Sequence, residues 1–286
     1  MNTEVVSPRP PRSIPVRHPK FRFEPQGGRH WLAGDPVLTH FVQALSLTFP
    51  EGEAFFMDSV AHFRRRIQEP TLRHEVARFL AQEAVHGKEH RAFNAWFSSQ
   101  GFDTEALERR IRDNLARARE LPPLHRLAIT CALEHFTAIM AEQILDNPEL
   151  LEQFDPGVRQ LWRWHAVEEA EHKSVAFDVY EAMGGRYPRR VIVMLVVTAQ
   201  FIFQITRIQA ALIRQDPEAQ GAGKALGALW VQWGNPGWLR RLVPAYLDYF
   251  RTGFHPWDRP ASEGLARAQE LLADTVVDTK PAAGVA

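Results

Sequence analysis

The chain has 286 residues, of which 45% are hydrophobic, and its 34 basic residues are balanced by 34 acidic ones. This composition is typical of a globular protein with a sizeable core, and a balanced charge offers no field that would attract nucleic acid. The single cysteine, Cys131, excludes an intramolecular disulfide and a cysteine-rich zinc site. We therefore expect a protein of a reducing compartment, the cytoplasm, with no nucleic-acid partner.

Residues 1–30 are rich in proline and lack the apolar run of a signal peptide, so we expect an extended N-terminal arm there. From residue 36 onwards the apolar spacing indicates helices, and Asp35-Pro36 and Glu69-Pro70 are typical helix starts. The expected helices cover 36–68 with a break or kink at Pro50, 70–99, 104–120, 122–147, 156–183, 188–215 and shorter stretches between 224 and 274.

The pattern predicts an all-α protein with one helical metal-binding domain over residues 31–260. Its core bundle would span about 36–184, and the added helices would span about 188–255. Residues 261–286 would form a C-terminal helix and a flexible tail.

Two segments carry the same pair of ionisable residues in apolar surroundings. "FLAQEAVHGKEH" contains Glu83 and His86, and "HAVEEAEHKSVAFD" contains Glu169 and His172. Residues three apart share one face of a helix. Because burial of an unpaired carboxylate or imidazolium costs several kcal/mol, such a cluster indicates solvent exposure, mutual neutralisation or a bound cation.

Each of these two helices follows another helix with a glutamate in an apolar setting, Glu53 in the first case and Glu134 in the second. The order Glu, Glu-x-x-His, Glu, Glu-x-x-His resembles the ligand set of ferritin-like dinuclear carboxylate proteins. This resemblance implies a four-helix bundle with a dinuclear metal site in its core. Glu168 satisfies nearly the same face as Glu169, which we prefer because it repeats the Glu83 and His86 spacing.

His165 lies four residues before Glu169 and seven before His172, so all three residues fall on one helix face. The spacing is similar to that in the di-iron arylamine N-oxygenases, where the extra imidazole is a third nitrogen ligand. We expect His165 to be a ligand too. His90, Glu168 and Asp178 are expected as outer partners of the ligands or as an extra ligand, and Glu171 and Lys173 as the outer face of their helix.

The resemblance extends to a family. The motifs "FPEGEAFF", "FLAQEAVHGKEH", "EHFTA", "WRWHAVEEAEHKSVAFDVY" and "GFHPWD" together resemble the bacterial proteins described as predicted metal-dependent hydrolases, over about residues 30–260. The resemblance implies metal-dependent chemistry. The sequence supplies none of the separate features of a hydrolase, such as a Ser or Cys nucleophile with a base beside it.

The expected metal ligands are Glu53, Glu83, His86, Glu134, His165, Glu169 and His172. A set of carboxylates and imidazoles without thiolate suits two iron ions, with manganese or zinc as alternatives. We favour O2-activating oxidation or oxygenation of a small, apolar organic substrate, which requires an external reductant. The alternatives are hydrolysis by a metal-bound hydroxide and a metal-storage or structural role.

Residues 191–206 contain no charged side chain, but at about 1.5 Å per residue they fall short of the roughly 30 Å hydrocarbon layer. They fit a core or homodimer-interface helix, and residues 191–250 also fit peripheral contact with a membrane. We accordingly expect an apolar small-molecule substrate and a cytoplasmic protein, with peripheral attachment at the inner face of the membrane as the alternative location.

Overall fold

The computed structural model describes residues 13–24, 28–235, 237–273 and 276–278. The all-α expectation is confirmed, because helices form nearly all of the regular structure in the described ranges. Residues 1–12 of the expected arm and 279–286 of the expected tail lie outside the described residues.

The α-helices lie within or close to the expected ranges. They are α1 (Pro36–Ala61), α2 (Pro70–Ser99), α3 (Glu105–Arg119), α4 (Pro123–Asp146), α5 (Pro148–Leu151), α6 (Pro156–His172), α7 (Val175–Ala182), α8 (Tyr187–Gln215), α9 (Ala222–Leu229), α10 (Trp238–Asp248) and α11 (Glu263–Leu271). Shorter helical turns are η1 (Pro217–Ala219), η2 (Trp230–Gly234) and η3 (Pro256–Asp258).

The two expected helix starts are confirmed. The side chain of Asp35 accepts hydrogen bonds from the backbone N–H groups of Val37 and Leu38 at the start of α1. Glu69 accepts in the same way from Thr71 and Leu72 at the start of α2. Each cap satisfies two backbone donors that have no partner within the helix, and each is followed by proline at the first helical position.

Helix α1 is not broken at Pro50 but continues through it, which leaves the kink of the two expected alternatives. Proline lacks the N–H that would bond to the carbonyl of Ser46 one turn earlier. Asn94 of α2 replaces that donor, since its Nδ2 donates to the Ser46 carbonyl oxygen over 3.0 Å. The expected helix over 156–183 is instead divided into α6 and α7 at Lys173 and Ser174.

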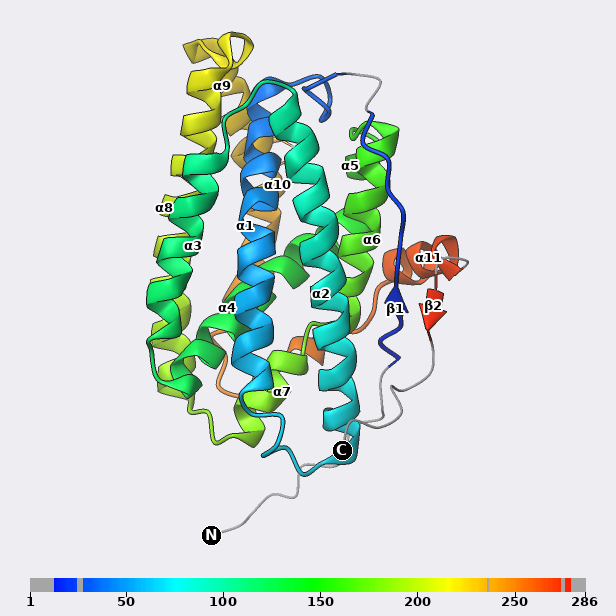
Figure 1. The fold of residues 1–286 in the computed structure, drawn as a ribbon, viewed down its shortest axis with the longest axis vertical. Coiled ribbons are helices and arrows are strands. Elements are labelled where there is room, and N and C mark those ends of the chain that lie inside the picture. Colours follow the sequence, from blue (N-terminus) through cyan, green and yellow to red (C-terminus); the bar gives the residue numbers. More distant parts are fainter. Residues whose placement is uncertain (1–12, 25–27, 236, 274–275, 279–286) are drawn as a thin grey trace.

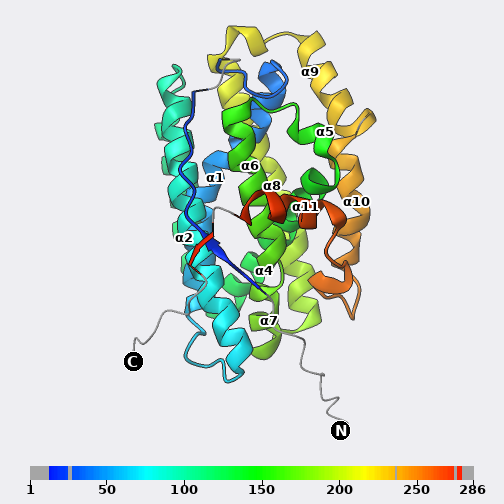
Figure 2. The same ribbon diagram turned by 90° about the vertical axis from the view of Figure 1, so that its right-hand side faces the viewer.

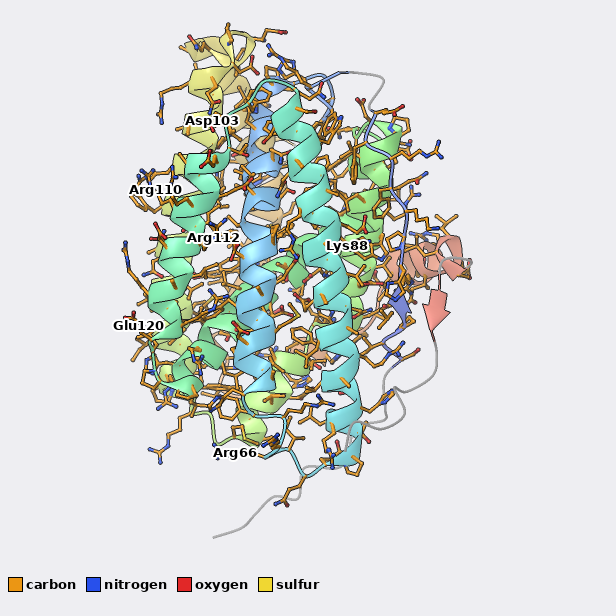
Figure 3. All side chains as sticks on the ribbon, viewed as in Figure 1. Arg66, Lys88, Asp103, Arg110, Arg112 and Glu120 are labelled. Carbon is orange, nitrogen blue, oxygen red and sulfur yellow. The ribbon has the colours of Figure 1, made fainter. Side chains whose placement is uncertain are left out.

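The helices run largely along the long axis of the molecule (Figure 1). Helix α1 packs against α2 and α3, α4 packs against α6, and α8 packs against both α1 and α4. Helices α10 and α11 also contact α4, and the turned view shows both (Figure 2). Charged side chains such as Lys88, Arg110 and Glu120 are exposed and extend from the outside of this assembly (Figure 3).

Strands β1 (Val16–Arg17) and β2 (Val276–Asp278) form an antiparallel pair that the sequence pattern did not predict. Strands of two and three residues are too short to show a recognisable alternation. The pairing joins segments from near the two ends of the chain alongside α2 and α6 (Figure 1). Ile14, Val16 and Arg17 of the arm are buried against the body.

Within the described part of the chain, α8 alone is long and apolar enough to cross a membrane, judged by length and composition. Only 28% of its most hydrophobic stretch is buried. Its outward face carries Ile192, Leu195, Ile202 and Phe203, each more than half exposed. The expectation of a buried core helix is therefore wrong for this face, while the interface and membrane expectations remain open.

Candidate metal centre

Helices α1, α2, α4 and α6 bring the seven expected ligands into one buried region. None of these residues is more than 4% exposed. Glu53 comes from α1, Glu83 and His86 from α2, Glu134 from α4, and His165, Glu169 and His172 from α6. The i, i+3 and i, i+4 spacings place the ligands of each helix on one face, as the sequence predicted.

The side chains form two adjoining groups. Within each group, the potential ligand atoms lie within 4.8 Å of one another. One contains Glu53, His86 and His165, and the other contains Glu83, Glu169 and His172. Glu134 joins the second group, with its Oε2 3.5 Å from His172 Nε2.

Glu169 belongs to the second group but also faces the two histidines of the first. Its Oε1 is 3.4 Å from both His86 Nδ1 and His165 Nε2, and its Oε2 is 3.7 Å from His172 Nε2. A carboxylate in this position can serve ions on both sides.

The donor atoms of this region fit a pair of cations. Among the described residues, both carboxylate oxygens of Glu53, Glu83 and Glu134 are buried without a hydrogen-bond partner. The same is true of the imidazole nitrogens that face the centre, namely His86 Nδ1, His165 Nε2 and His172 Nε2. Buried polar atoms are almost always hydrogen-bonded. This concentration of unpartnered oxygen and nitrogen atoms therefore indicates that cations would bind there.

Protonation in the metal-free chain also reflects crowded negative charge. Burial, reinforced by neighbouring carboxylates, raises the pKa of Glu53 and of Glu134 well above the usual value. Burial likewise raises the pKa of Glu83. Burial and the nearby His86 lower the pKa of His165 to about 3, which keeps its imidazole neutral and able to bind a metal.

The outward nitrogens of the imidazoles each have a partner, an arrangement typical of metal-bound histidines. His86 Nε2 lies 3.0 Å from Glu168 Oε2, which fits the expected outer role of Glu168. His172 Nδ1 lies 2.9 Å from Gln82 Oε1. The sequence analysis did not identify Gln82, although its position directly before Glu83 was the available signal.

His90 also takes an outer position. Its Nε2 lies 3.1 Å from His165 Nδ1, and its Nδ1 lies 2.9 Å from Ser46 Oγ. Ser46 in turn donates to Asn94 Oδ1 over 2.7 Å. This series of hydrogen bonds fixes the ring of His165, because Nδ1 of His165 can donate to Nε2 of His90 while Nε2 of His165 faces the centre. The aromatic ring of Phe49 stacks on His165 at 4.8 Å.

Asp178 accepts from His255 Nε2 over 2.9 Å and from Ser174 Oγ over 2.7 Å, and these contacts link α7 to the turn before η3; its expected role beside the ligands stays a prediction. One expectation about neighbouring residues is wrong. Glu171 and Lys173 are not on an outer face, since they are 3% and 4% exposed. The N-terminal arm covers Glu171.

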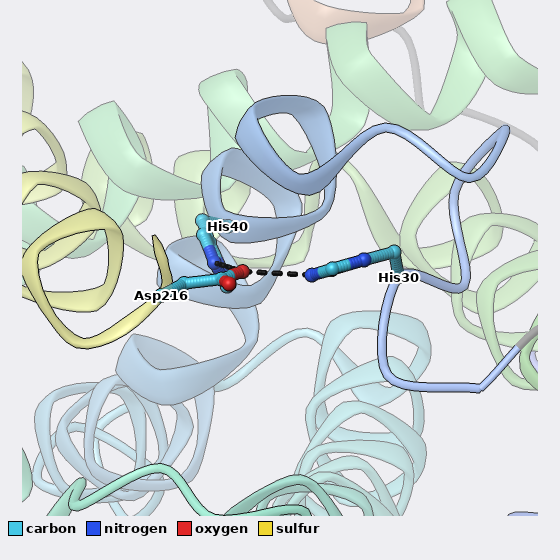
Figure 4. A group of neighbouring side chains, drawn as sticks. All are labelled: His30, His40 and Asp216. Carbon is cyan, nitrogen blue, oxygen red and sulfur yellow. Dashed lines mark hydrogen bonds and ion pairs between the residues drawn. The ribbon is translucent and has the colours of Figure 1, made fainter. Parts of the chain in front are cut away.

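A third group of potential ligands lies apart from this centre at the far end of α8. Figure 4 shows His30 and His40 directed at the carboxylate of Asp216. Their Nε2 atoms lie 2.7 and 2.8 Å from the same oxygen, Asp216 Oδ2. The other oxygen accepts from Arg29 and from the backbone N–H of Glu218.

In this third group all four acceptor positions of the carboxylate are used, and Arg29 already supplies a positive charge. His40 Nδ1 is also buried without a hydrogen-bond partner in the described chain, whereas metal-bound histidines normally donate from that second nitrogen. These contacts describe a hydrogen-bonded clasp that joins the segment before α1, α1 itself and the end of α8, rather than a metal site.

Two cavities reach the candidate centre. The first has a volume of about 90 Å³ and ends at His165. The second has a volume of about 150 Å³ and ends at Glu53. Phe49, Thr137 and Met140 line both and separate them. No Asp, Glu, Lys or Arg lines the first cavity, and Glu53 alone of these types lines the second, within the described residues.

The fold and these side chains define an all-α protein with a buried, carboxylate-rich candidate metal centre. The chain belongs to the family described as predicted metal-dependent hydrolase, whose model matches residues 15–260. This confirms the family resemblance drawn from the sequence and supports metal-dependent chemistry. No curated protein and no solved structure matches the chain.

Proposed function

We propose that the chain is a dinuclear metal enzyme of ferritin-like architecture, with its centre between α1, α2, α4 and α6. The observation that carries this proposal is the convergence of unpartnered carboxylate and imidazole atoms from four helices on one buried region. Glu53, His86 and His165 would hold one ion, Glu83, Glu134 and His172 the other, and Glu169 would bridge them. Four carboxylates would balance two divalent ions. Iron suits these ligands best, with manganese or zinc as alternatives.

Hydrolysis is the reaction that the family description favours. When bound, the two ions would supply Lewis acidity for hydrolysis or, if they are iron, electrons for the reduction of O2. The chain's own residues hold the centre in a fixed geometry. Glu168, Gln82 and His90 orient the three imidazoles, and burial restricts access to the two cavities.

A second candidate function is the O2-dependent oxidation or oxygenation of an organic molecule with an external reductant. Two observations favour it: the ligand set has no thiolate, and the described lining of the two cavities has no charged side chain other than Glu53, itself a proposed ligand. In both reactions we propose a small, apolar substrate, since Phe41, Leu45, Ile144 and other apolar side chains form the first cavity.

We further propose a cytoplasmic protein that attaches peripherally to membranes through α8 and α10, with a homodimer through the same face as the alternative. The exposed apolar residues of α8 and the second cavity, which α8 helps to line, support this placement. Flotation with phospholipid vesicles tests it. Wild-type protein should rise with the vesicles, Phe203→Glu should not, and wild-type protein that stays in the dense fraction contradicts the attachment.

Metal analysis of the purified chain tests the dinuclear proposal. We expect two ions per chain in the wild type, a loss of stoichiometric loading in Glu83→Ala and Glu169→Ala, and full loading in the control Glu51→Ala. Glu51 lies on α1 near Glu53 but pairs with Arg112 at the surface. Retention of two ions by either ligand variant would contradict the assignment.

The reaction class is tested on the same protein. Anaerobic reconstitution with Fe(II) followed by O2 should give a ligand-to-metal charge-transfer band if the centre activates oxygen. Zinc- or manganese-loaded protein should cleave neutral aryl esters if it is a hydrolase. Ester cleavage that Glu83→Ala abolishes, together with Fe(II) that does not react with O2, would decide for hydrolysis.

A further inference from the structure

The partners of two candidate ligands, His86 and His172, belong to one hydrogen-bonded layer on the outside of the centre. We call the side chains of Arg17, Gln82, Glu168 and Glu171 the outer layer. Arg17 lies in strand β1 of the N-terminal arm, roughly 150 residues away in sequence from the two glutamates of α6 that it contacts. The outer layer therefore joins the arm to the helices that carry the metal ligands.

Arg17 is the centre of the outer layer. Its Nη1 and Nη2 donate to the two oxygens of Glu171, each over 2.8 Å, in a bidentate pair. Nη1 also donates to Glu168 Oε1 over 3.2 Å. The three side chains are at most 3% exposed. Without this guanidinium, Glu168 would keep only His86 at ion-pair distance, and Glu171 would have no basic side chain there within the described residues. Gln269 of α11 adds a neutral donor to Glu171.

This arrangement determines which nitrogen of His86 faces the centre with a lone pair. Glu168 Oε1 accepts from Arg17 and from Trp164 Nε1, which leaves Oε2 for His86 Nε2. A carboxylate oxygen at this position accepts, so His86 Nε2 carries the hydrogen. In the neutral ring, the form that binds a metal ion, the lone pair then lies on Nδ1, the atom 3.6 Å from Glu83 Oε1 and 3.4 Å from Glu169 Oε1.

The same layer fixes His172 through the amide of Gln82. Gln82 Nε2 donates to Glu171 Oε2 over 3.1 Å and to the Pro15 carbonyl of the arm over 2.9 Å. Because both partners are acceptors, the amide oxygen must face His172 Nδ1. His172 then donates from Nδ1 and presents the lone pair of Nε2 towards Glu83 and Glu134.

We propose that Arg17 is a positioning residue of the metal centre: the arm inserts its guanidinium between Glu168 and Glu171 and thereby sets the tautomers of His86 and His172 for metal binding. This inference rests on the proposed function, because it requires that the centre binds ions. It makes the N-terminal arm a component of the site.

Cobalt(II) provides the test, since its visible d–d absorption reports ligand number and geometry. Full-length wild type, Arg17→Ala, Arg17→Lys and Gln82→Leu would be titrated with Co(II) and unfolded thermally. Arg78→Ala is the matched control, because Arg78 Nε also fixes the arm, by donating to the Ile14 carbonyl, and Arg78 is not among the donors to Glu168 and Glu171 within the described residues. Gln82→Leu keeps the Arg17 ion pairs and removes only the amide, so it remains informative if Arg17→Ala does not fold.

We expect Arg17→Ala and Gln82→Leu to lose about 10- to 100-fold in Co(II) affinity and to change the absorption bands. Arg17→Lys should recover part of the affinity, because lysine keeps the charge but not the bidentate geometry. Arg78→Ala should bind Co(II) as the wild type does, even if it unfolds at a lower temperature.

Two results would overturn the inference while leaving the dinuclear centre intact. One is wild-type affinity and absorption in Arg17→Ala or in Gln82→Leu. The other is an equal loss in Arg78→Ala, which would mean that the arm acts through stability alone. A wild-type chain that binds no Co(II) would instead overturn the proposed function, and this inference with it.

Discussion

Replacement of Glu134 by glutamine should stabilise the metal-free protein and weaken the metal-loaded one. Glu134 is 2% exposed, and in the described chain neither of its oxygens has a hydrogen-bond partner. Burial, with Glu83 and Glu169 nearby, raises the pKa of Glu134 well above its usual value. The stability that a raised carboxyl pKa provides is complete below the unfolded pKa and is lost as the pH rises through the folded pKa. Glutamine does not ionise, so the variant does not lose this stability as the pH rises.

The magnitudes follow from these contacts. Glutamine stays polar and unpaired but cannot ionise, so only the charge-dependent part of the burial cost is removed. If that part is about 1 to 2 kcal/mol, metal-free Glu134→Gln should unfold about 2 to 4 °C above the wild type at pH 8. Two ions, each at a hundred times its Kd, stabilise the wild type by about 5 kcal/mol, or about 10 °C. The variant loses a ligand next to His172, and loss of that ion would halve the gain. The order of the two melting temperatures should therefore reverse when metal is added.

Differential scanning calorimetry of both proteins, after chelation and after reloading, measures this reversal. Glu142→Gln is the control on the same helix, since Glu142 pairs with Lys173 outside the ligand set. It should not stabilise the metal-free chain. A metal-free Glu134→Gln variant that is less stable than the wild type at pH 8, or one that gains as much from metal, would refute the reasoning.

Three further predictions concern other parts of the molecule. Burial lowers the pKa of His135 to about 4, so the free energy of unfolding should fall by about 3 kcal/mol as the pH falls from 6.5 to about 4. Urea unfolding of His135→Gln should show a flatter dependence of this free energy on pH. Asp216→Asn should lower the free energy of unfolding by about 1 to 3 kcal/mol yet leave two ions per chain by metal analysis; a lost third ion would refute the clasp. Ile144→Trp should fill the first cavity and weaken the binding of long-chain neutral probes in fluorescence titrations without changing metal content, whereas unchanged binding would place the substrate elsewhere.

The parts of the site that lie on regular helices could be predicted from the sequence. Glu83 with His86 and Glu169 with His172 share a face by helical geometry alone, and their apolar neighbours indicated burial. The choice between Glu168 and Glu169 could not be made in this way, because both lie close to the same face. Only the packing of α2 against α6 places Glu168 Oε2 at His86 and directs Glu169 between the two groups.

The outer layer was beyond prediction from local pattern. Glu171 is two residues from Glu169 and so points to the other side of α6, which a helix pattern assigns to solvent. The arm covers that side, and the contact between Arg17 and Glu171 depends on how distant segments fold together. The proline-rich composition of the arm indicated an extended chain but contained no information about where it would dock.

The charges near the candidate centre are matched by other charges close to them, so the cavity walls carry little charge of their own. Two divalent ions would match the four inner carboxylates, and Arg17 offsets part of the charge of Glu168 and Glu171. A charged substrate in the first cavity would lose its hydration and find no basic or acidic side chain among the described lining residues. A neutral substrate would instead gain about 0.8 kcal/mol for each methylene that it buries. We therefore propose that a hydrocarbon would be selected by its length and shape in the cavity, while the reacting group would be recognised at ions bound beside His165.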